Sequence, residues 1–228
     1  MKIAILGWEE GLAGQASTWV ENALGAELVC FVHPFESIPA IDLLSAFDRP
    51  AKRFSVPVEG LYRGLPILVG LDWPRQLNDL GVDGAVCCLS NSVSREESFL
   101  QAANSGIPML TAIHPSAQIL AESEISTGVI IEPNCYVGYR AEVGEGTHVH
   151  AGSQVDHHSV LKPYVTVNPG VIIAGNALVG SHSVLNMGAL ISNRIELGES
   201  TVVGAGSTVL ESYPLGHVRL IGTPARPG

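Results

Sequence analysis

The chain has 228 residues, of which 46% are hydrophobic and 15% charged, so it can build a folded core and is not a disordered acidic protein. Aromatic residues make up only 6%, against 25 glycines, which favours repetitive β structure over a helical bundle. The formal net charge of −10 argues against a nucleic-acid partner, because phosphate neutralisation needs clustered Lys and Arg.

The sequence shows no membrane or metal signal. No segment reaches the roughly 18 consecutive apolar residues of a membrane span, and the apolar N-terminal run is too short for a secretory signal. The four cysteines form no CxxC pair and no metal-ligand spacing, which favours reduced thiols. We therefore expect a cytoplasmic protein with no membrane partner and no metal.

The first half alternates short apolar runs with helical patterns, which predicts a small parallel α/β sheet. The predicted strands cover residues 2–6, 27–32, 66–69, 84–89 and 108–113. The predicted helices cover residues 17–24 and 94–104, the second with Ser94 as N-cap and Glu97 completing a capping box. Residues 33–61 are expected to form a long connection with a short helix near 41–47.

Three glycines follow the first predicted strand, Gly7, Gly11 and Gly14, without matching GxGxxG. Glycines at this place either form a plain strand-to-helix turn or let a phosphate approach the backbone at a helix N-terminus. Their spacing leaves both interpretations open.

The second half carries a repeat of six residues. From Ile113 to Ile221 every sixth residue is aliphatic, at nineteen successive positions, and small or β-branched residues dominate four positions later. Such a repeat predicts a three-sided β-solenoid, whose aliphatic side chains fill the interior while small ones fit the corners. About six coils at about 4.8 Å each give a prism about 29 Å tall. We therefore predict two domains, residues 1–112 and 113–228.

The hexad pattern resembles the hexapeptide-repeat acyltransferases, whose fold is a left-handed parallel β-helix. The resemblance is closest to the NeuD/PglD-like sugar O/N-acyltransferases, and it covers nearly the whole chain. The matching segments are residues 14–24, 64–70, 95–117 ending in IHPSA, 155–159, 169–180, and a closing GTPAR at 222–226. The resemblance implies a Rossmann-like N-terminal domain that binds a nucleotide sugar and a β-helix that binds acetyl-CoA.

The resemblance also implies catalytic residues in the β-helix. His157 matches the family's catalytic histidine, and a neutral imidazole suits a general base. Gly175 lies eighteen residues later, so it stacks beside His157, and the family implies that its backbone N–H binds an oxyanion. His158 stands where relatives often carry an acidic residue that orients the catalytic ring. Asp156 is the nearest carboxylate, although adjacent strand residues point to opposite faces.

Further positions are implied to contact the cofactor or the acceptor. Thr166 replaces a histidine that faces the cofactor in relatives, and Met187 and Ala205 match backbone contacts to acetyl-CoA. His148, one coil before Thr166, either takes that histidine's place or is a solvated surface residue. The substrate-binding candidates of the N-terminal half are Gly14, Gln15, His33, Asn91 and Arg95. Gly14-Gln15 stands for the family's Gly-His pair, and His33-Pro34 replaces acidic residues that touch the nucleotide base.

Together these features predict an acetyl-CoA-dependent N-acetyltransferase of polysaccharide biosynthesis, acting on an amino sugar in nucleotide-linked form. No Ser or Cys nucleophile motif stands out, which favours direct transfer over an acyl-enzyme. A sugar O-acetyltransferase and a non-catalytic solenoid that binds a sugar nucleotide stay open as alternatives. The family also implies a homotrimer with active sites between neighbouring subunits.

A γ-type carbonic anhydrase is a further alternative, because that family shares the hexapeptide solenoid and needs three histidines that converge on zinc between subunits. The candidate ligands are His148, His150, His157, His158 and His182. The family's Hx4H spacing is absent, so we disfavour this alternative.

Overall fold

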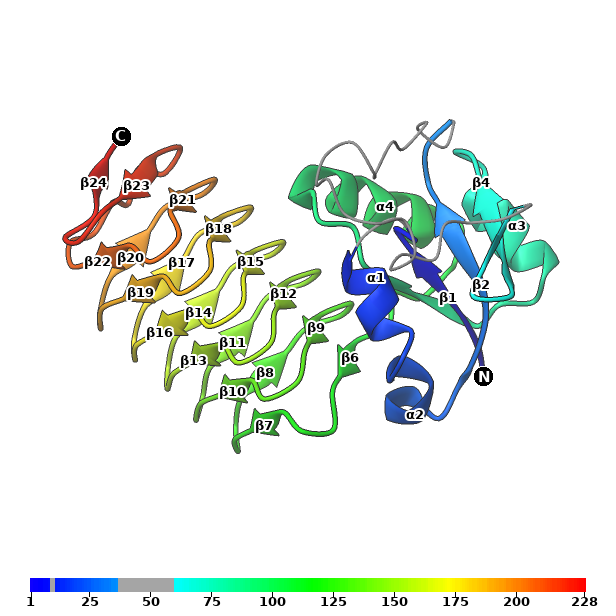
Figure 1. Ribbon diagram of the computed structural model, residues 1–228, viewed down its shortest axis with the longest axis horizontal. Helices are drawn as coiled ribbons and strands as arrows, with labels where there is room; N and C mark the ends of the chain where they lie inside the picture. The colour runs from blue at the N-terminus through cyan, green and yellow to red at the C-terminus, as the bar shows by residue number, and fades with distance from the viewer. Residues whose placement is uncertain (9–10, 37–59) are drawn as a thin grey trace, which may run out of the picture.

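The computed structural model describes residues 1–8, 11–36 and 60–228, which form an α/β region followed by a β-helix (Figure 1). The sheet of the α/β region has the strand order β3-β4-β2-β1-β5. Its strands are β1 (Lys2–Leu6), β2 (Glu27–His33), β3 (Leu61–Tyr62), β4 (Leu65–Val69) and β5 (Gly84–Cys87). All neighbours are parallel except the β3–β4 pair, so the predicted small parallel sheet is confirmed.

The helices of the α/β region differ in part from the prediction. They are α1 (Gly11–Ala16), α2 (Val20–Leu24), α3 (Trp73–Asp79) and α4 (Ser92–Asn104). The chain is already helical at residue 11, so Gly14 lies inside α1 rather than before a helix that starts at residue 17. Helix α3 was not predicted from the sequence, although Trp73 and Leu77 form a buried apolar face on it. The short helix expected near 41–47 lies outside the described residues.

Helix α4 begins two residues before the predicted start. The side chain of Asn91 accepts hydrogen bonds at 3.0 Å from the backbone N–H groups of Val93 and Ser94, which makes Asn91 the N-cap. Ser94, the predicted cap, therefore lies within the first turn. The strand predicted at 108–113 reduces to a bridge at Met109 and the short strand β6 (Ala112–Ile113).

The β-helix consists of short parallel strands on three faces. One face holds β7 (Gln118–Ile119), β10 (Tyr136–Val137), β13 (Gln154–Val155), β16 (Ile172–Ile173), β19 (Leu190–Ile191) and β22 (Thr208–Val209). The second holds β8 (Glu124–Ile125), β11 (Glu142–Val143), β14 (Val160–Leu161), β17 (Leu178–Val179) and β20 (Glu196–Leu197). The third holds β6, β9 (Ile130–Ile131), β12 (His148–Val149), β15 (Thr166–Val167), β18 (Val184–Leu185), β21 (Val202–Val203), β23 (Arg219–Ile221) and β24 (Arg226–Pro227).

Each coil contains eighteen residues through β22. In register, Tyr136 pairs with Gln154, and His148 pairs with Thr166. The aliphatic residue of each hexad points inward, and from Ile131 to Val209 these side chains are 0–2% exposed. Burying each one stabilises the fold by about 1.5–3 kcal/mol before entropy is counted. The predicted three-sided solenoid and its apolar interior are therefore confirmed.

The small residues at the corners have a second role that the repeat alone does not reveal. Ser153 and Ser159 are fully buried, and their hydroxyls donate to the carbonyls of Asn168 at 2.9 Å and of Ala174 at 3.0 Å. These carbonyls lie in corners fifteen residues ahead, and that of Asn168 also accepts the Val171 N–H at 3.3 Å. Serine therefore fits the corner by its hydrogen bond as well as by its size.

The repeat ends earlier than predicted. Strand β23 pairs Leu220, not Ile221, with Val203, so the last coil is one residue shorter than the others. Leu220 is buried, whereas Ile221 is 50% exposed and Leu215 is 93% exposed. The aliphatic residues at 215 and 221 continue the spacing without filling the interior, and their predicted inward position is wrong.

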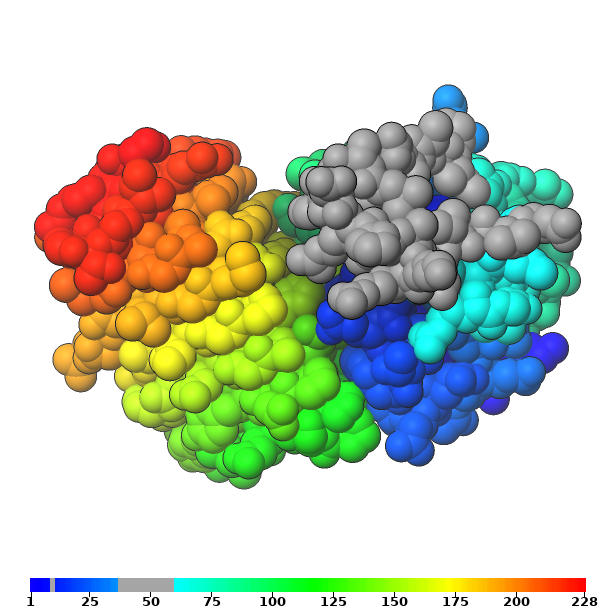
Figure 2. Space-filling view, viewed as in Figure 1, coloured from blue at the N-terminus to red at the C-terminus, as the bar shows by residue number. Residues whose placement is uncertain are grey.

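A buried polar seam joins the α/β region to the first coils of the β-helix, which lie side by side in Figures 1 and 2. Arg95 of α4 is fully buried and donates to the carbonyl of Leu89 at 2.8 Å, the carbonyl of Tyr164 at 2.9 Å and Thr166 Oγ1 at 3.0 Å. His148 Nε2 lies 2.8 Å from the carbonyl of Cys87. The predicted boundary at 112/113 falls within β6, which already belongs to the ladder of the third face.

The seam predicts a loss of stability in acid. Burial, followed by the charge of Arg95, holds the pKa of His148 well below its usual value of 6.5, so folding excludes a proton that the unfolded chain binds. Stability is therefore fully present above about pH 6.5 and is lost below it by at most about 1.4 kcal/mol per pH unit. His148→Gln removes this ionisable group, so the thermal midpoint of the variant should fall less between pH 7.5 and 5.5 than that of the wild type. His217→Gln changes an exposed histidine and is the control; equal slopes for all three proteins would contradict the prediction.

Candidate functional site

His157 lies at a corner of the β-helix, directly after β13, and its side chain is exposed. A Cβ atom built on Gly175 would lie 2.5 Å from Nε2 and from Cε1 of the His157 ring. The edge of the imidazole therefore covers Gly175, and no larger residue fits beneath it. The Gly175 N–H makes no hydrogen bond to another described residue. The predicted stacking of these two residues is thus present, with a free donor beside Nε2.

His158 holds the other side of the His157 ring. The two Nδ1 atoms are 3.1 Å apart, and the rings meet at 84°. The ring of His158 also packs edge-on against Tyr139, at 5.7 Å between centroids. Asp156 does not reach the imidazole, because its Oδ1 accepts the backbone N–H of His157 at 2.7 Å.

The contact between the two rings restricts where their protons lie. A hydrogen bond between two Nδ1 atoms contains one proton, carried by one ring and accepted by the other. If His157 carries it, its Nε2 has a free lone pair and can take a proton. If His158 carries it, neutral His157 has its proton on Nε2 and cannot act as a base there. A base at Nε2 of His157 therefore requires His158 to accept.

The predicted cofactor contacts occupy other parts of the β-helix. Met187 and Ala205 lie at a second corner, stacked by the bond from Gly206 N–H to the Met187 carbonyl at 2.9 Å, and both are exposed. One chain therefore does not bring them together with His157. Thr166 is buried, and Arg95 donates to its hydroxyl. The expectation that Thr166 faces the cofactor is wrong for this chain, because the α/β region covers it.

The predicted substrate residues are placed around the α/β region. Gln15 is exposed on α1, and Gly14 packs so closely that an added Cβ would lie 3.2 Å from Tyr62 Oη. His33 ends β2, buried beside Trp8 and Phe35. The side chain of Asn91 caps α4.

Arg95 and His148 require correction. Arg95 was expected to contact the nucleotide, but its guanidinium is buried among backbone carbonyls of the seam. His148 is only 1% exposed, so it is not a solvated surface residue. Sequence patterns missed both burials because they cannot show that another part of the chain covers a face. It also missed Glu132 and His150, although their spacing of eighteen residues places them in contact.

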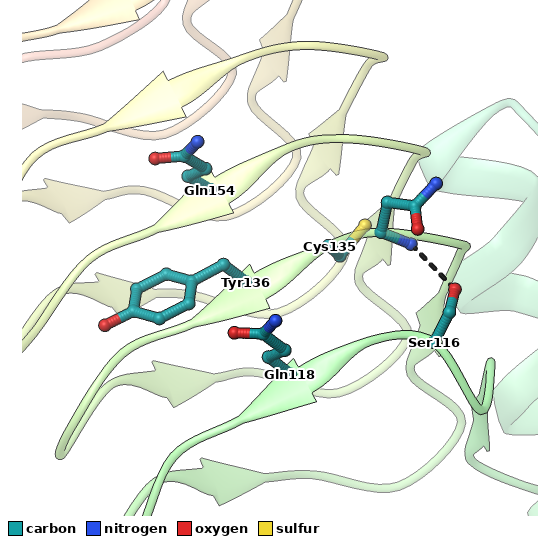
Figure 3. Close-up of a pocket in the computed structure, with 6 residues that line it drawn as sticks. Ser116, Gln118, Cys135, Tyr136 and Gln154 are labelled. Carbon is teal, nitrogen blue, oxygen red and sulfur yellow. Dashed lines mark hydrogen bonds between the residues drawn. The ribbon is translucent and has the colours of Figure 1, made fainter.

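A shallow polar pocket of about 360 Å³ lies on the face that contains β7, β10 and β13 (Figure 3). It is lined by Ser116, Gln118, Asn134, Cys135, Tyr136 and Gln154. In the close-up Gln118, Tyr136 and Gln154 stand on successive strands, and the Asn134 N–H donates to Ser116 Oγ at 3.1 Å. None of the predicted site residues lines it.

Among the described residues, no group of three or more His, Cys, Asp or Glu side chains is arranged to hold a metal ion. His157 and His158 contact each other, while His148 and His150 lie on a different face. Within one chain, the described histidines therefore do not form a three-histidine cluster. In the part of the chain that is described, no helix is long and apolar enough to cross a membrane.

Comparison with solved structures identifies the fold. PerB from Caulobacter crescentus, solved with CoA and GDP-perosamine, is 22% identical with a TM-score of 0.83, covering 100% of this chain and 97% of its own. The acetyltransferase domain of PglB from Neisseria gonorrhoeae, solved with acetyl coenzyme A, is 24% identical with a TM-score of 0.79, covering 100% and 98%. WeeI from Acinetobacter baumannii is 22% identical with a TM-score of 0.79, covering 100% of both chains.

These matches confirm the predicted fold along the whole chain, a small α/β domain followed by a left-handed parallel β-helix of hexapeptide repeats. No protein-family model matches the sequence, and a search of curated proteins finds no match.

The tight contact at Gly175 gives a structural prediction. Gly175→Ala places a methyl group where the His157 ring now lies, so the ring must turn away and lose its contact with His158. We expect a changed His157 rotamer in a crystal structure and a free energy of unfolding within about 1 kcal/mol of wild type, because the corner is exposed. Asn193→Ala, at the exposed corner one coil further on, is the control. An unmoved ring in Gly175→Ala would contradict the packing described here.

Proposed function

We propose that the protein is an acetyl-CoA-dependent N-acetyltransferase acting on an amino sugar joined to a nucleoside diphosphate, in cytoplasmic polysaccharide biosynthesis. One observation carries the proposal: an exposed imidazole covers a glycine with a free N–H. This arrangement occurs in a fold shared over the whole chain with proteins solved with CoA, acetyl coenzyme A and GDP-perosamine.

The residues of this corner supply the two groups that direct acyl transfer needs. Acetyl-CoA brings the acyl group as a thioester. Nε2 of His157 accepts the proton of the attacking amine, while His158 accepts the Nδ1–H and holds the ring in orientation. The Gly175 N–H lies where it can donate to the carbonyl oxygen as negative charge develops there.

The acceptor would bind at the carboxyl end of the parallel sheet, which faces the β-helix at the seam. Ligands of open α/β sheets bind outside the carboxyl ends of the strands. His33 at the end of β2, and Asn91 and Gln15 beside the neighbouring helices, remain the proposed contacts on this side. Gly14 lies inside helix α1 and not in a loop after β1, so we assign it a packing role beside Gln15.

A homotrimer would complete the site. His157 and Gly175 lie at one corner of the prism, whereas Met187 and Ala205 lie at another, so one cofactor molecule held between two β-helices could meet both pairs. Exposed Ile172 and Leu190, paired side by side on the face between these corners, are suited to such packing.

A second candidate is a non-catalytic solenoid that binds a sugar nucleotide, favoured because no carboxylate of the described residues bonds to the His157 ring. Calorimetric titration with acetyl-CoA separates the two candidates, since a protein that has lost the transferase reaction needs no acetyl-CoA site. A sugar O-acetyltransferase would use the same residues, and product analysis distinguishes an amide from an ester.

Replacing His157 tests the chemistry. His157→Ala should lower kcat for CoA release with an amino-sugar acceptor by about 10²–10⁴-fold, because the proton acceptor is lost. KM values should change little, since the ring lies beside the reacting atoms and not along the bound ligands. His217→Ala, another exposed histidine of the β-helix, is the control. Unchanged turnover in His157→Ala would remove this residue from the mechanism.

Light scattering tests the assembly. Three chains of 24.0 kDa give a particle of about 72 kDa. Ile172→Glu places a charge on the exposed apolar face and should shift the mass toward one chain, with loss of acetyl-CoA binding in parallel. A wild-type mass of 24.0 kDa together with full activity would contradict a site shared between subunits.

A further inference from the structure

A histidine–carboxylate pair lies beside His148 of the seam, separate from the His157 corner. Glu132 follows β9, and His150 follows β12 one coil later. Nδ1 of His150 lies 3.0 Å from Glu132 Oε2, which also accepts the Ala151 N–H at 3.0 Å. The Glu132 side chain is 3% exposed and that of His150 is 18% exposed. A carboxylate this deeply buried is costly unless its hydrogen bonds are filled.

The pair has a defined arrangement of protons. Burial raises the pKa of Glu132, but the hydrogen bonds from His150 and from the Ala151 N–H outweigh burial and bring it below its usual value. An ionised carboxylate only accepts, so His150 donates from Nδ1. Nε2 of His150 makes no hydrogen bond to another described residue, and neither does the buried Oε1 of Glu132. Within the described part of the chain, both atoms therefore remain without a partner, and Oε1 is an open acceptor.

The pair lies beside the edge of the sheet where a ligand is expected. In the strand order β3-β4-β2-β1-β5, the strands after β1 are added first on one side of it and then, with β5, on the other. Ligands bind outside the carboxyl ends of the strands at such a switch in strand order. β5 ends at Cys87, whose carbonyl lies 2.8 Å from His148 Nε2. The ring of His150 lies 6.0 Å from that of His148. Figure 1 shows the strands β9 and β12 on the side of the β-helix that faces the α/β region.

We propose that Glu132 and His150 form a recognition site for a hydroxyl group of the acceptor sugar. The inference rests on the proposed function and names residues of the β-helix that would select its acceptor. The ionised carboxylate has an unpartnered acceptor at Oε1, so the pair favours a ligand group that donates a hydrogen bond. The amine is the reacting group and must reach His157 at another corner, which leaves a hydroxyl as the donor read here. His150 is therefore a positioning and specificity residue and not the base.

The test compares His150→Gln and Glu132→Gln with wild type, using a nucleoside-diphosphate amino sugar and analogues that lack single hydroxyl groups. We expect KM and the calorimetric Kd for the full acceptor to rise about tenfold in both variants. The kcat should stay within threefold, and the KM for acetyl-CoA should not change. One deoxy analogue should bind wild type about tenfold more weakly than the full acceptor does. The same analogue should bind His150→Gln no more weakly than it binds wild type. His217→Gln, which breaks the exposed pair of His217 and Glu199 at 2.9 Å, is the matched control and should behave as wild type.

The outcomes are separable. If the wild-type protein turns over the acceptor and His150→Gln has the same KM and Kd for it, this inference is overturned and the proposed function stays intact. The same conclusion follows if a variant binds every deoxy analogue and acetyl-CoA more weakly by the same factor, because that result indicates a structural role. A wild-type protein that binds acetyl-CoA but none of the acceptors would overturn the inference and the acceptor class together. Failure to bind either compound would overturn the proposed function itself.

Discussion

The eighteen-residue register of the β-helix decides which polar side chains meet. Parallel ladders hold each residue above the one eighteen positions earlier, as with Tyr136 and Gln154. That rule places the His157 ring over Gly175 and His150 over Glu132. Because side chains alternate between inside and outside along a strand, inserting one residue would exchange the two sets above it. The apolar interior thus fixes the positions of the polar groups on the surface.

The seam shows how a second constraint acts on the same register. Arg95 is fully buried, and backbone carbonyls on both sides of the seam accept its hydrogen bonds. Burial of His148, followed by the charge of Arg95, holds the pKa of this histidine well below its usual value. A neutral ring that donates from Nε2 to the Cys87 carbonyl has a lone pair on Nδ1, which faces the Arg95 guanidinium at 3.4 Å. The two halves are therefore joined by groups that satisfy one another only when they are correctly aligned.

The sequence was sufficient for the fold because the interior of a solenoid depends on spacing, which is local. It also indicated that Gly175 lies beside His157, since stacking follows from counting. It was insufficient where the determining contact is distant. The polarity of Arg95 and His148 suggests solvent, and only the packing of α4 on the third face buries them. Likewise the aliphatic Leu215 keeps the period of six after the coil has lost a residue, so periodicity overestimates the repeat.

The His157–His158 and Glu132–His150 pairs of the β-helix differ in what the partner can do. An ionised Glu132 can only accept, so the hydrogen between the two groups belongs to Nδ1 of His150. His158 can either donate to His157 or accept from it. A base at Nε2 of His157 is possible only when His158 accepts, because a neutral ring with its proton on Nδ1 leaves a lone pair on Nε2. The partner of His150 thus has one role, whereas the partner of His157 has two, and the proposed chemistry depends on which of them His158 takes.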